Sequence, residues 1–316
     1  MKLQQLQVLV HVVDHGGIRA AARQLHLSQA AVTKSMRLLE EVAGVSLLRR
    51  GSRGVEPTEA GEKLLARARL VTRQVELAQE ELRQLAGEDE GRVRIGLTPY
   101  VTLTALGEAF HWFRQRYREV KVEFSEGLMR RVLPRLRDGT LDLAVVAADV
   151  GELQGDEFSV RRLSRARQHI VVREGHPVLT QPSAALLAQQ EWVMTHPIPA
   201  DRQNRVWAMF ALAGLEPPER VVVCETLAAL TLLRNSDAVG IMPEPLQGHP
   251  ESRGIVAVPD CGLTPTDIEL LLLARPDIPL TPAAEFFGHC VAQIISGEAG
   301  AARPQVVNSA APSAHP

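Results

Sequence analysis

Several features that mark specialised classes of protein are scarce in this sequence of 316 residues. Only three cysteines occur (Cys224, Cys261 and Cys290), without a CxxC pair or paired histidines at ligand spacing, which argues against a disulfide framework and a structural zinc site. No apolar run approaches the roughly 20 residues that cross a bilayer. The amino terminus lacks the layout of a secretory signal, because Gln, His and Asp interrupt its apolar residues. We therefore expect a cytoplasmic protein without membrane contact, metal or other cofactor.

The chain also lacks an overall basic charge, since its formal net charge is −2. Hydrophobic residues make up 45% and charged residues 23%, the balance of an ordinary globular protein, and the length suits two or three domains. Positive charge is nevertheless concentrated at the amino terminus, where residues 1–57 carry eight basic and four acidic side chains, a difference of +4. A local basic patch of this kind is compatible with nucleic-acid binding.

The first sixty residues predict three helices followed by a hairpin. Apolar residues at helical spacing over residues 6–13 indicate a first helix that ends at Gly16-Gly17. A short second helix over about residues 18–25 and a turn at His26-Leu27 follow. Ser28 is a suitable N-cap for a third helix that ends at Gly44. The residues expected to face inward are Leu6, Leu9, Val10, Val13, Ala21, Ala22, Leu25, Val32, Met36 and Leu39.

The outward face of the third helix is polar from its first turn onward. Such residues can contact base edges or phosphates from the major groove. Residues 47–55 indicate a short hairpin with a basic tip, which can contact the minor groove or the phosphates. A structural three-helix subdomain with a solvated charged face is the alternative, but the three features together favour DNA binding. The predicted DNA-contacting residues are Ser28, Gln29, Ala30, Thr33, Lys34, Arg37, Arg50 and Arg53.

This segment resembles the LysR-type family of bacterial transcription regulators. The matching residues are 20–33 (AAARQLHLSQAAVT), Leu38-Leu39-Glu40, 44–48 (GVSLL), Arg50 and 58–61 (TEAG), and the resemblance extends to about residue 295. It implies a multidomain α/β protein with an N-terminal winged helix-turn-helix, a long linker helix and a C-terminal two-lobed effector domain of type 2 periplasmic-binding-protein topology. Gly17, Ala30 and Leu48 replace the family's usual Ser, Pro and Phe, and we expect the fold to accommodate all three.

Residues 58–85 contain no proline and predict one long helix. Its apolar residues alternate at spacings of four and three, the seam of a coiled coil. Pairing with a second subunit would cover this stripe and present two recognition helices to an inverted-repeat promoter site. The alternative is that the stripe packs on the chain's own core. The predicted dimerisation residues are Leu64, Ala68, Val71, Val75, Ala78, Leu82 and Leu85.

Beyond a polar hinge at residues 87–91, strand and helix patterns alternate as in an α/β domain. Strands are expected at about 93–97, 120–124, 141–147, 169–173, 192–195, 220–224 and 268–274. Helices are expected over 103–113, 129–136, 183–188, 203–213, 227–234 and 281–295. The predicted domains are 1–57, 58–90 and 91–296, followed by a disordered tail at 297–316. The resemblance divides 91–296 into one lobe of 91–164 with 268–296 and another of 165–267.

The effector is expected between these lobes, because ligands of doubly wound sheets collect at the carboxyl ends of strands, near helix N-termini. Hydroxyls, an imidazole and helix N-termini favour a small anion such as a carboxylate. Each residue also has a structural interpretation: Thr98 and Thr226 as helix caps, His196 as a loop residue and Tyr100 as part of the wall between the lobes. The predicted effector-binding residues are Thr98, Tyr100, Val101, Thr102, Ala147, Thr195, His196 and Thr226.

Three competing functions are weaker. An enzyme is disfavoured because GxSxG, GxGxxG and P-loop motifs are absent. A solute-binding protein is disfavoured because it would not need the predicted N-terminal DNA-binding module. A redox-responsive regulator would use Cys224 and Cys261, which have no helpful basic neighbours. The sequence therefore favours a regulator that binds promoter DNA as a homodimer or homotetramer, with RNA polymerase as a further candidate partner.

Overall fold

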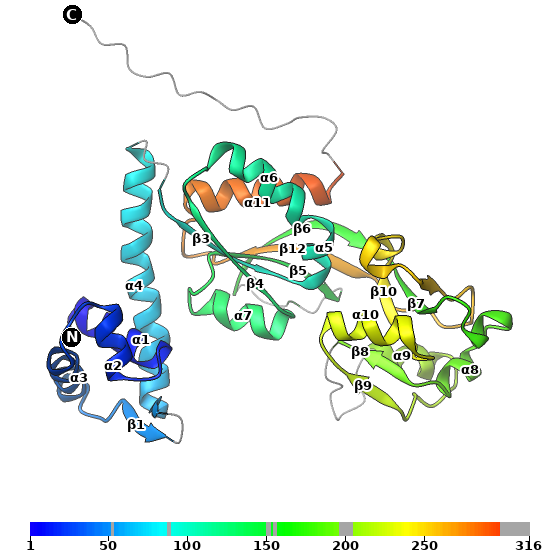
Figure 1. Cartoon of the computed structure of the whole chain (residues 1–316), viewed down its shortest axis with the longest axis horizontal. Helices are drawn as coiled ribbons and strands as arrows, with labels where there is room; N and C mark the ends of the chain where they lie inside the picture. The colour runs from blue at the N-terminus through cyan, green and yellow to red at the C-terminus, as the bar shows by residue number, and fades with distance from the viewer. Residues whose placement is uncertain (52–53, 87–89, 150–152, 154–156, 196–204, 298–316) are drawn as a thin grey trace, which may run out of the picture.

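The computed structural model describes residues 1–51, 54–86, 90–149, 153, 157–195 and 205–297. Figure 1 shows three parts in chain order: a group of short helices with a hairpin, one long helix, and a two-lobed α/β region. Within the described ranges, no helix combines the length and the apolar character that crossing a membrane requires. The observed fold class is the predicted one, a multidomain α/β protein.

Three short helices form the amino-terminal part and share one apolar core. Small alanines bring the second helix close to the others, as predicted. The inward face of the first helix differs slightly from its prediction, since Val8 and Val12 are buried while Val10 and Val13 are only partly covered. The helices are α1 (Leu3–Asp14), α2 (Ile18–Gln24) and α3 (Gln29–Ala43), and their core includes Leu6, Val8, Leu9, Val12, Ala21, Ala22, Val32, Met36 and Leu39.

The third helix begins and ends at the predicted residues. The Ser28 hydroxyl accepts a hydrogen bond from the Ala31 backbone N–H at 3.1 Å, which caps the first turn. Gly44 ends the helix in the left-handed conformation, with φ of 69°. This local capping fixes where the polar face of α3 starts.

An antiparallel hairpin follows, made of β1 (Leu48–Gly51) and β2 (Gly54–Pro57). A carboxylate of α3 steers the chain into it: Oε1 of Glu40 accepts hydrogen bonds from the backbone N–H groups of Leu47 at 2.8 Å and Leu48 at 3.3 Å. The glutamate of the family motif therefore has a structural role, which is to join the third helix to the hairpin.

The long helix α4 (Glu59–Leu85) begins against the hairpin. The Thr58 hydroxyl caps it by accepting a hydrogen bond from the Gly61 backbone N–H at 3.0 Å. A Cβ atom at Gly61 would lie 1.9 Å from the backbone oxygen of Leu47, so no side chain fits there. The TEAG motif thus supplies both the helix cap and the close approach that seats α4 on the amino-terminal part.

The first lobe, called lobe I, is a five-stranded sheet with helices on both faces. Three neighbouring strands run parallel, and β12 pairs antiparallel with two strands. Helices α6 and α11 cover one face and α7 covers the other (Figure 1). In sheet order the strands are β4 (Lys121–Glu126), β3 (Arg92–Leu97), β5 (Leu143–Asp149), β12 (Ile268–Ala274) and β6 (Ser159–Ala166), and the helices are α5 (Pro99–Thr104), α6 (Leu106–Arg116), α7 (Met129–Arg137) and α11 (Pro282–Ile295).

The second lobe, lobe II, has a three-stranded antiparallel sheet and a two-stranded parallel sheet, joined by a bridge between Trp192 and Val239. Trp192 and Phe210 are fully buried in its core. The strands are β7 (Gln168–Arg173), β8 (Trp192–Met194), β9 (Val221–Val223), β10 (Gly240–Pro243) and β11 (Ile255–Ala257). The helices are α8 (Ala184–Ala188), α9 (Arg205–Leu212) and α10 (Thr226–Asn235), with short 3-10 turns η1 (Pro177–Thr180), η2 (Glu244–Leu246) and η3 (Pro250–Ser252).

Strands β10 and β11 were not expected from the sequence, and two further elements also differ from the prediction. The helix expected over 103–113 is two helices, α5 and α6, which are separated at Ala105. Strand β6 was not expected, because its residues SVRRLSRA are mostly polar and exposed, and it forms by pairing along the full length of β12. Neither feature leaves a clear periodicity in the sequence.

Candidate functional site

The outward face of α3 offers polar groups along a single ridge. Gln29, Ala30, Thr33 and Lys34 are exposed, as is Arg37 one turn further on. The Thr33 hydroxyl donates to the backbone oxygen of Gln29 at 2.9 Å and still has lone pairs for an external donor. Arg37 lies 3.2 Å from Glu41, but both side chains are more than half exposed, so this pair is weak and can be exchanged for a phosphate.

The turn before α3 lies at the predicted residues, but its backbone conformation was not predicted. His26 has φ of 53°, a left-handed conformation that is unfavourable for a residue with a Cβ atom. The turn is closed by a hydrogen bond from the Leu27 backbone N–H to the Ala22 oxygen at 2.9 Å. His26 therefore sets the angle between α2 and α3.

The hairpin follows α3 in the chain and exposes one described basic side chain, that of Arg49. Arg49 on β1 is 68% exposed and lies 3.6 Å from Glu56 on β2, so it too is loosely paired. Arg50 pairs its backbone with Val55, but its side chain and the whole of Arg53 lie outside the described residues. The predictions for these two side chains stay predictions.

The predicted seam on α4 divides into two halves. Ala68 is fully buried in the amino-terminal core and Leu64 packs against the same core, so the alternative interpretation holds for these residues and the dimerisation prediction was wrong for Ala68. The reason is that the first half of α4 packs on α1. Further along, Val71 is 46% and Leu82 is 68% exposed. Of the other predicted members, Ala78 is exposed, Val75 is half-buried, and the Leu85 side chain is outside the described residues.

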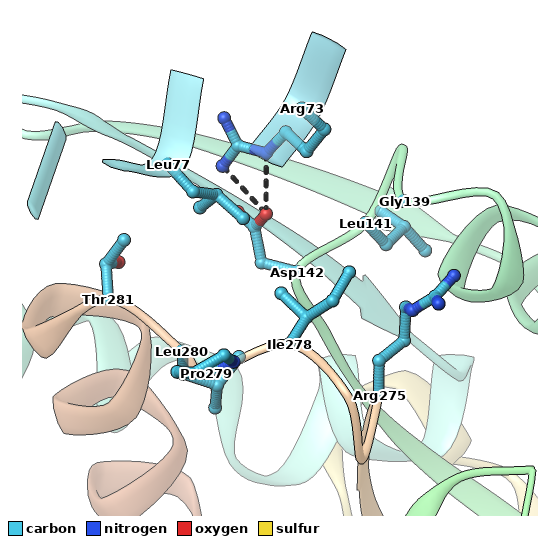
Figure 2. A pocket seen from close by; sticks show the side chains of 10 residues that line it. All are labelled: Arg73, Leu77, Gly139, Leu141, Asp142, Arg275, Ile278, Pro279, Leu280 and Thr281. Carbon is cyan, nitrogen blue, oxygen red and sulfur yellow. Dashed lines mark hydrogen bonds and ion pairs between the residues drawn. The ribbon is translucent and has the colours of Figure 1, made fainter. Parts of the chain in front are cut away.

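A different stripe of α4 binds lobe I through buried charges (Figure 2). The Arg73 side chain is 5% exposed and lies 2.7 Å from Oδ1 of Asp142, whose side chain is 4% exposed. Asp142 also accepts a hydrogen bond from the Arg94 backbone N–H at 2.8 Å, and Glu80 lies 3.4 Å from Arg73. The adjacent cavity is ≈ 10 Å³, room for one water molecule and no larger ligand. This cluster is therefore a structural junction.

The charge state of the junction follows from burial and pairing. Burial lowers the pKa of Arg73, but Asp142 and Glu80 outweigh it and hold that pKa above its ordinary value. Burial raises the pKa of the Glu80 carboxyl more than the attraction of Arg73 lowers it. The junction thus holds one firmly charged arginine and one carboxylate that is costly to ionise.

Arg69, one turn before Arg73, joins three parts of the chain. Its guanidinium lies 2.5 Å from Asp14 at the end of α1 and 3.0 Å from Asp138 at the end of α7. The sequence did carry a signal, since residues 69, 73, 76 and 80 repeat charged side chains at the same four-and-three spacing as the apolar stripe. This stripe marks the face of α4 that binds lobe I.

The predicted effector residues of lobe I have distinct environments. Thr98 is 2% exposed, and its hydroxyl accepts a hydrogen bond from the Ala147 backbone N–H at 2.9 Å instead of capping α5, so its predicted cap role was wrong. The Val101 side chain is fully buried in the core of lobe I, which excludes it as a contact of the effector. Thr102 and Ala147 are half-buried.

Tyr100 lies where the lobes meet. It packs against the apolar core of lobe I and against the cluster of lobe II that contains Leu230 and Met242. Burial raises the pKa of its phenol, so the hydroxyl stays protonated and able to donate. This position matches the predicted wall between the lobes.

The predicted residues of lobe II follow β8 and β9. Thr195 is half-buried just after β8, and Thr226 is the half-buried first residue of α10. Glu225 holds the N-cap position, so Thr226 is not the helix cap. His196 lies outside the described residues. Thr98, Thr195 and Thr226 therefore lie beyond the carboxyl ends of β3, β8 and β9, whereas Ala147 lies within β5.

The three thiols are poorly suited to redox sensing. Cys261 and Cys290 are buried and Cys224 is partly covered. Burial raises the pKa of each thiol, to about 12 for Cys290, which disfavours the reactive thiolate.

Comparison with known proteins agrees with this geometry. Residues 3–62 match the model of the bacterial regulatory helix-turn-helix protein, lysR family, and residues 86–294 match the LysR substrate binding domain. The HTH-type transcriptional regulator PcaQ of Agrobacterium fabrum is 29% identical over 307 residues, covering 94% of this chain and 97% of its own.

Two solved structures share the fold of nearly the whole chain. Full-length CbnR complexed with its target DNA gives a TM-score of 0.63 at 22% identity, covering 93% of this chain and 100% of that one. Full-length LysG from Corynebacterium glutamicum with bound effector arginine gives 0.62 at 19% identity, covering 93% and 98%. The chain therefore belongs to the LysR family and is a DNA-binding transcription regulator with an effector-binding domain.

Proposed function

We propose that this regulator binds an inverted-repeat promoter site in double-stranded DNA and responds to a small anionic effector held between lobes I and II. The observation that carries the DNA part is the exposed polar ridge of α3, which starts at a capped N-terminus and is followed in the chain by a hairpin with an exposed arginine, Arg49. Polar and basic groups in this arrangement reach base edges and phosphates. The similar fold of CbnR in complex with its target DNA supports the same use of this surface.

Assembly into a homodimer, and further into a homotetramer, completes the proposal. Val71 at the middle of α4, and Ala78 and Leu82 in its second half, leave apolar surface exposed. Covering this surface with a second copy removes it from water and places two α3 helices on one DNA duplex. The contact is expected between the second halves of two α4 helices, because the first half is occupied by α1.

An effector acts by favouring one arrangement of the lobes over another. A ligand shifts such an equilibrium only to the extent that it binds one state more tightly. In the proposed mechanism, closing the lobes alters the angle between DNA-binding pairs, and with it the bending of the promoter and the access of RNA polymerase. The effector arginine of the similar LysG carries a carboxylate but has a net positive charge, so it supports the carboxylate of the proposed ligand and not its overall charge.

The DNA part is tested with a fluorescent duplex from the promoter region upstream of the protein's own gene. Replacing Gln29 by Ala should weaken specific binding by about 1–3 kcal/mol and relax base preference. Replacing Lys34 by Ala should weaken binding to all sequences and lower the salt slope by about 1. The control is Gln115→Ala, an exposed glutamine of α6 in lobe I. Equal affinities for all four proteins would contradict the assigned surface.

A further inference from the structure

The predicted effector residues that the structure describes carry no charge: they are Thr98, Tyr100, Thr102, Ala147, Thr195 and Thr226. An anionic ligand removed from water needs a paired charge or several hydrogen bonds. One ion pair joins the two lobes: its member in lobe I follows β4, the parallel neighbour of β3, and its member in lobe II directly precedes Thr226. It joins Arg131 on the first turn of α7 in lobe I to Glu225 at the start of α10 in lobe II, at 2.8 Å. The charge for an anionic effector is thus present, and it is already occupied.

Both members of this pair stand where each lobe presents its predicted ligand residues. Arg131 follows β4, and Glu225 follows β9 and directly precedes Thr226. The Glu225 side chain does not cap its own helix, although it holds the N-cap position, and reaches across to the other lobe. A carboxylate is therefore bound to Arg131 from the side of lobe II.

The backbone under Arg131 fixes its position. A Cβ atom added at Gly127, which is buried, would lie 3.1 Å from Cβ and 3.4 Å from Cδ of Arg131. The aliphatic stem of the arginine thus lies against Gly127, and its guanidinium extends toward lobe II. The arginine is held at its base, while its charged end can exchange partners.

The strength of the pair permits such an exchange. The Arg131 side chain is 62% exposed and the Glu225 side chain is 55% exposed, so water screens their attraction. A ligand carboxylate that also contacts the hydroxyl groups of both lobes gains interactions that Glu225 lacks.

We propose that Arg131 binds the carboxylate of the effector and that Glu225 pairs with Arg131 as an internal competitor when the effector is absent. This proposal rests on the proposed function. The competitor makes the site selective for charge. A neutral analogue of the effector leaves the pair intact and gains nothing from Arg131, whereas an anion replaces one carboxylate by another.

The effect of removing the competitor follows from the fraction of Arg131 that is free. An exposed ion pair leaves its members separated for a substantial part of the time, so Glu225→Gln should tighten binding of an anion about two- to sixfold. Arg131→Gln should weaken it by at least about tenfold, the loss expected for hydrogen bonds to a charged group.

The test uses benzoate, benzamide and benzylamine, which share a ring and differ in charge, in thermal-shift titrations of the full chain. Benzoate should stabilise Glu225→Gln at lower concentration than the unchanged protein and should fail with Arg131→Gln. Benzamide should not distinguish the three proteins. The matched controls are Arg130→Gln and Glu126→Gln, which remove exposed charges next to the pair and should behave like the unchanged protein.

Several results would overturn the proposal. One is benzoate acting equally on all variants, and another is no benzoate effect even in Glu225→Gln, where the guanidinium is released. Benzylamine stabilisation that depends on Glu225 would assign the site to cations instead. Promoter binding is measured on the same samples without ligand. If all variants bind the promoter and only the ligand results fail, the proposal about Arg131 and Glu225 is wrong and the proposed function stands. If no variant binds the promoter, the proposed function itself is refuted.

Discussion

Replacing Arg73 by Met is expected to loosen α4 from lobe I at a large cost in stability. The substitution keeps the aliphatic volume and removes the charge that faces Asp142 and Glu80, whose side chains are 4% and 10% exposed. Leaving a buried charge without its partner costs about 3–5 kcal/mol. Asp142 keeps its hydrogen bond from the Arg94 backbone N–H, so we expect the lower end of this range.

The measurement is thermal unfolding at neutral pH and fixed protein concentration. A loss of about 3 kcal/mol corresponds to a decrease in Tm of roughly 6–12 °C for a domain of this size. Arg92→Met is the matched control, because Arg92 lies on β3 of lobe I, is 40% exposed and pairs loosely with Glu123 at 3.4 Å. It should change stability by no more than about 0.5 kcal/mol.

A double variant separates two contributions to the lost stability: the attraction between Arg73 and Asp142, and the cost of leaving Asp142 buried without its charged partner. Arg73→Met combined with Asp142→Leu removes the Arg73–Asp142 pair and leaves Glu80 as the remaining acidic group, and replacing a buried pair by apolar residues is often close to neutral. The double variant should therefore recover part of the lost stability. Equal Tm values for Arg73→Met and Arg92→Met would refute the reasoning, since the buried cluster would then contribute no more than an exposed pair.

Three further predictions concern other positions. Gly61→Ala should lower the Tm of the helix-turn-helix part and weaken DNA binding, because its Cβ atom would lie 1.9 Å from the Leu47 oxygen; Gly107→Ala, with open space around it, is the control and should be harmless. His26→Val should destabilise by about 1–2 kcal/mol and His26→Gly should not, since φ is 53°; equal urea midpoints for both variants would exclude strain at this turn. Glu80→Gln should raise the Tm at pH 7.5, because burial raises the pKa of Glu80 in the fold and its ionisation opposes folding as the pH rises through that value. Below the unfolded-state pKa of about 4.3 the carboxyl is neutral in both states and the gain should vanish, so a gain of the same size at low pH would contradict this assignment.

The amino-terminal part was largely predictable from sequence because its signals are local. Ser28 and Gly44 determine where α3 begins and ends, and the buried face of that helix is the predicted one. His26 adopts a strained left-handed conformation, which could not be predicted from its residue type. Helix caps and apolar periodicity depend on residues close together in the sequence, so they can be predicted without knowledge of the tertiary contacts.

The sequence was less informative where long-range packing decides the role of a residue. Ala68 fits a coiled-coil seam by spacing, yet contact with α1 buries it within its own chain. Thr98 has the side chain of a helix cap, but its hydroxyl binds the backbone of Ala147, 49 residues further along the chain. Strand β6 forms only because β12 is available beside it.

Helix α7 has an unusual pair of attachments at its two ends. Its first turn carries Arg131, which reaches lobe II, and it ends at Asp138, which Arg69 holds together with Asp14. Although Pro134 lies inside it, α7 is only nine residues long and packs on the sheet of lobe I, so its two ends move together. A movement of α7 at the lobe boundary must therefore have one of two results. Either the amino-terminal helices move with α7, because the Arg69 guanidinium joins them to it, or Arg69 separates from Asp14 or from Asp138.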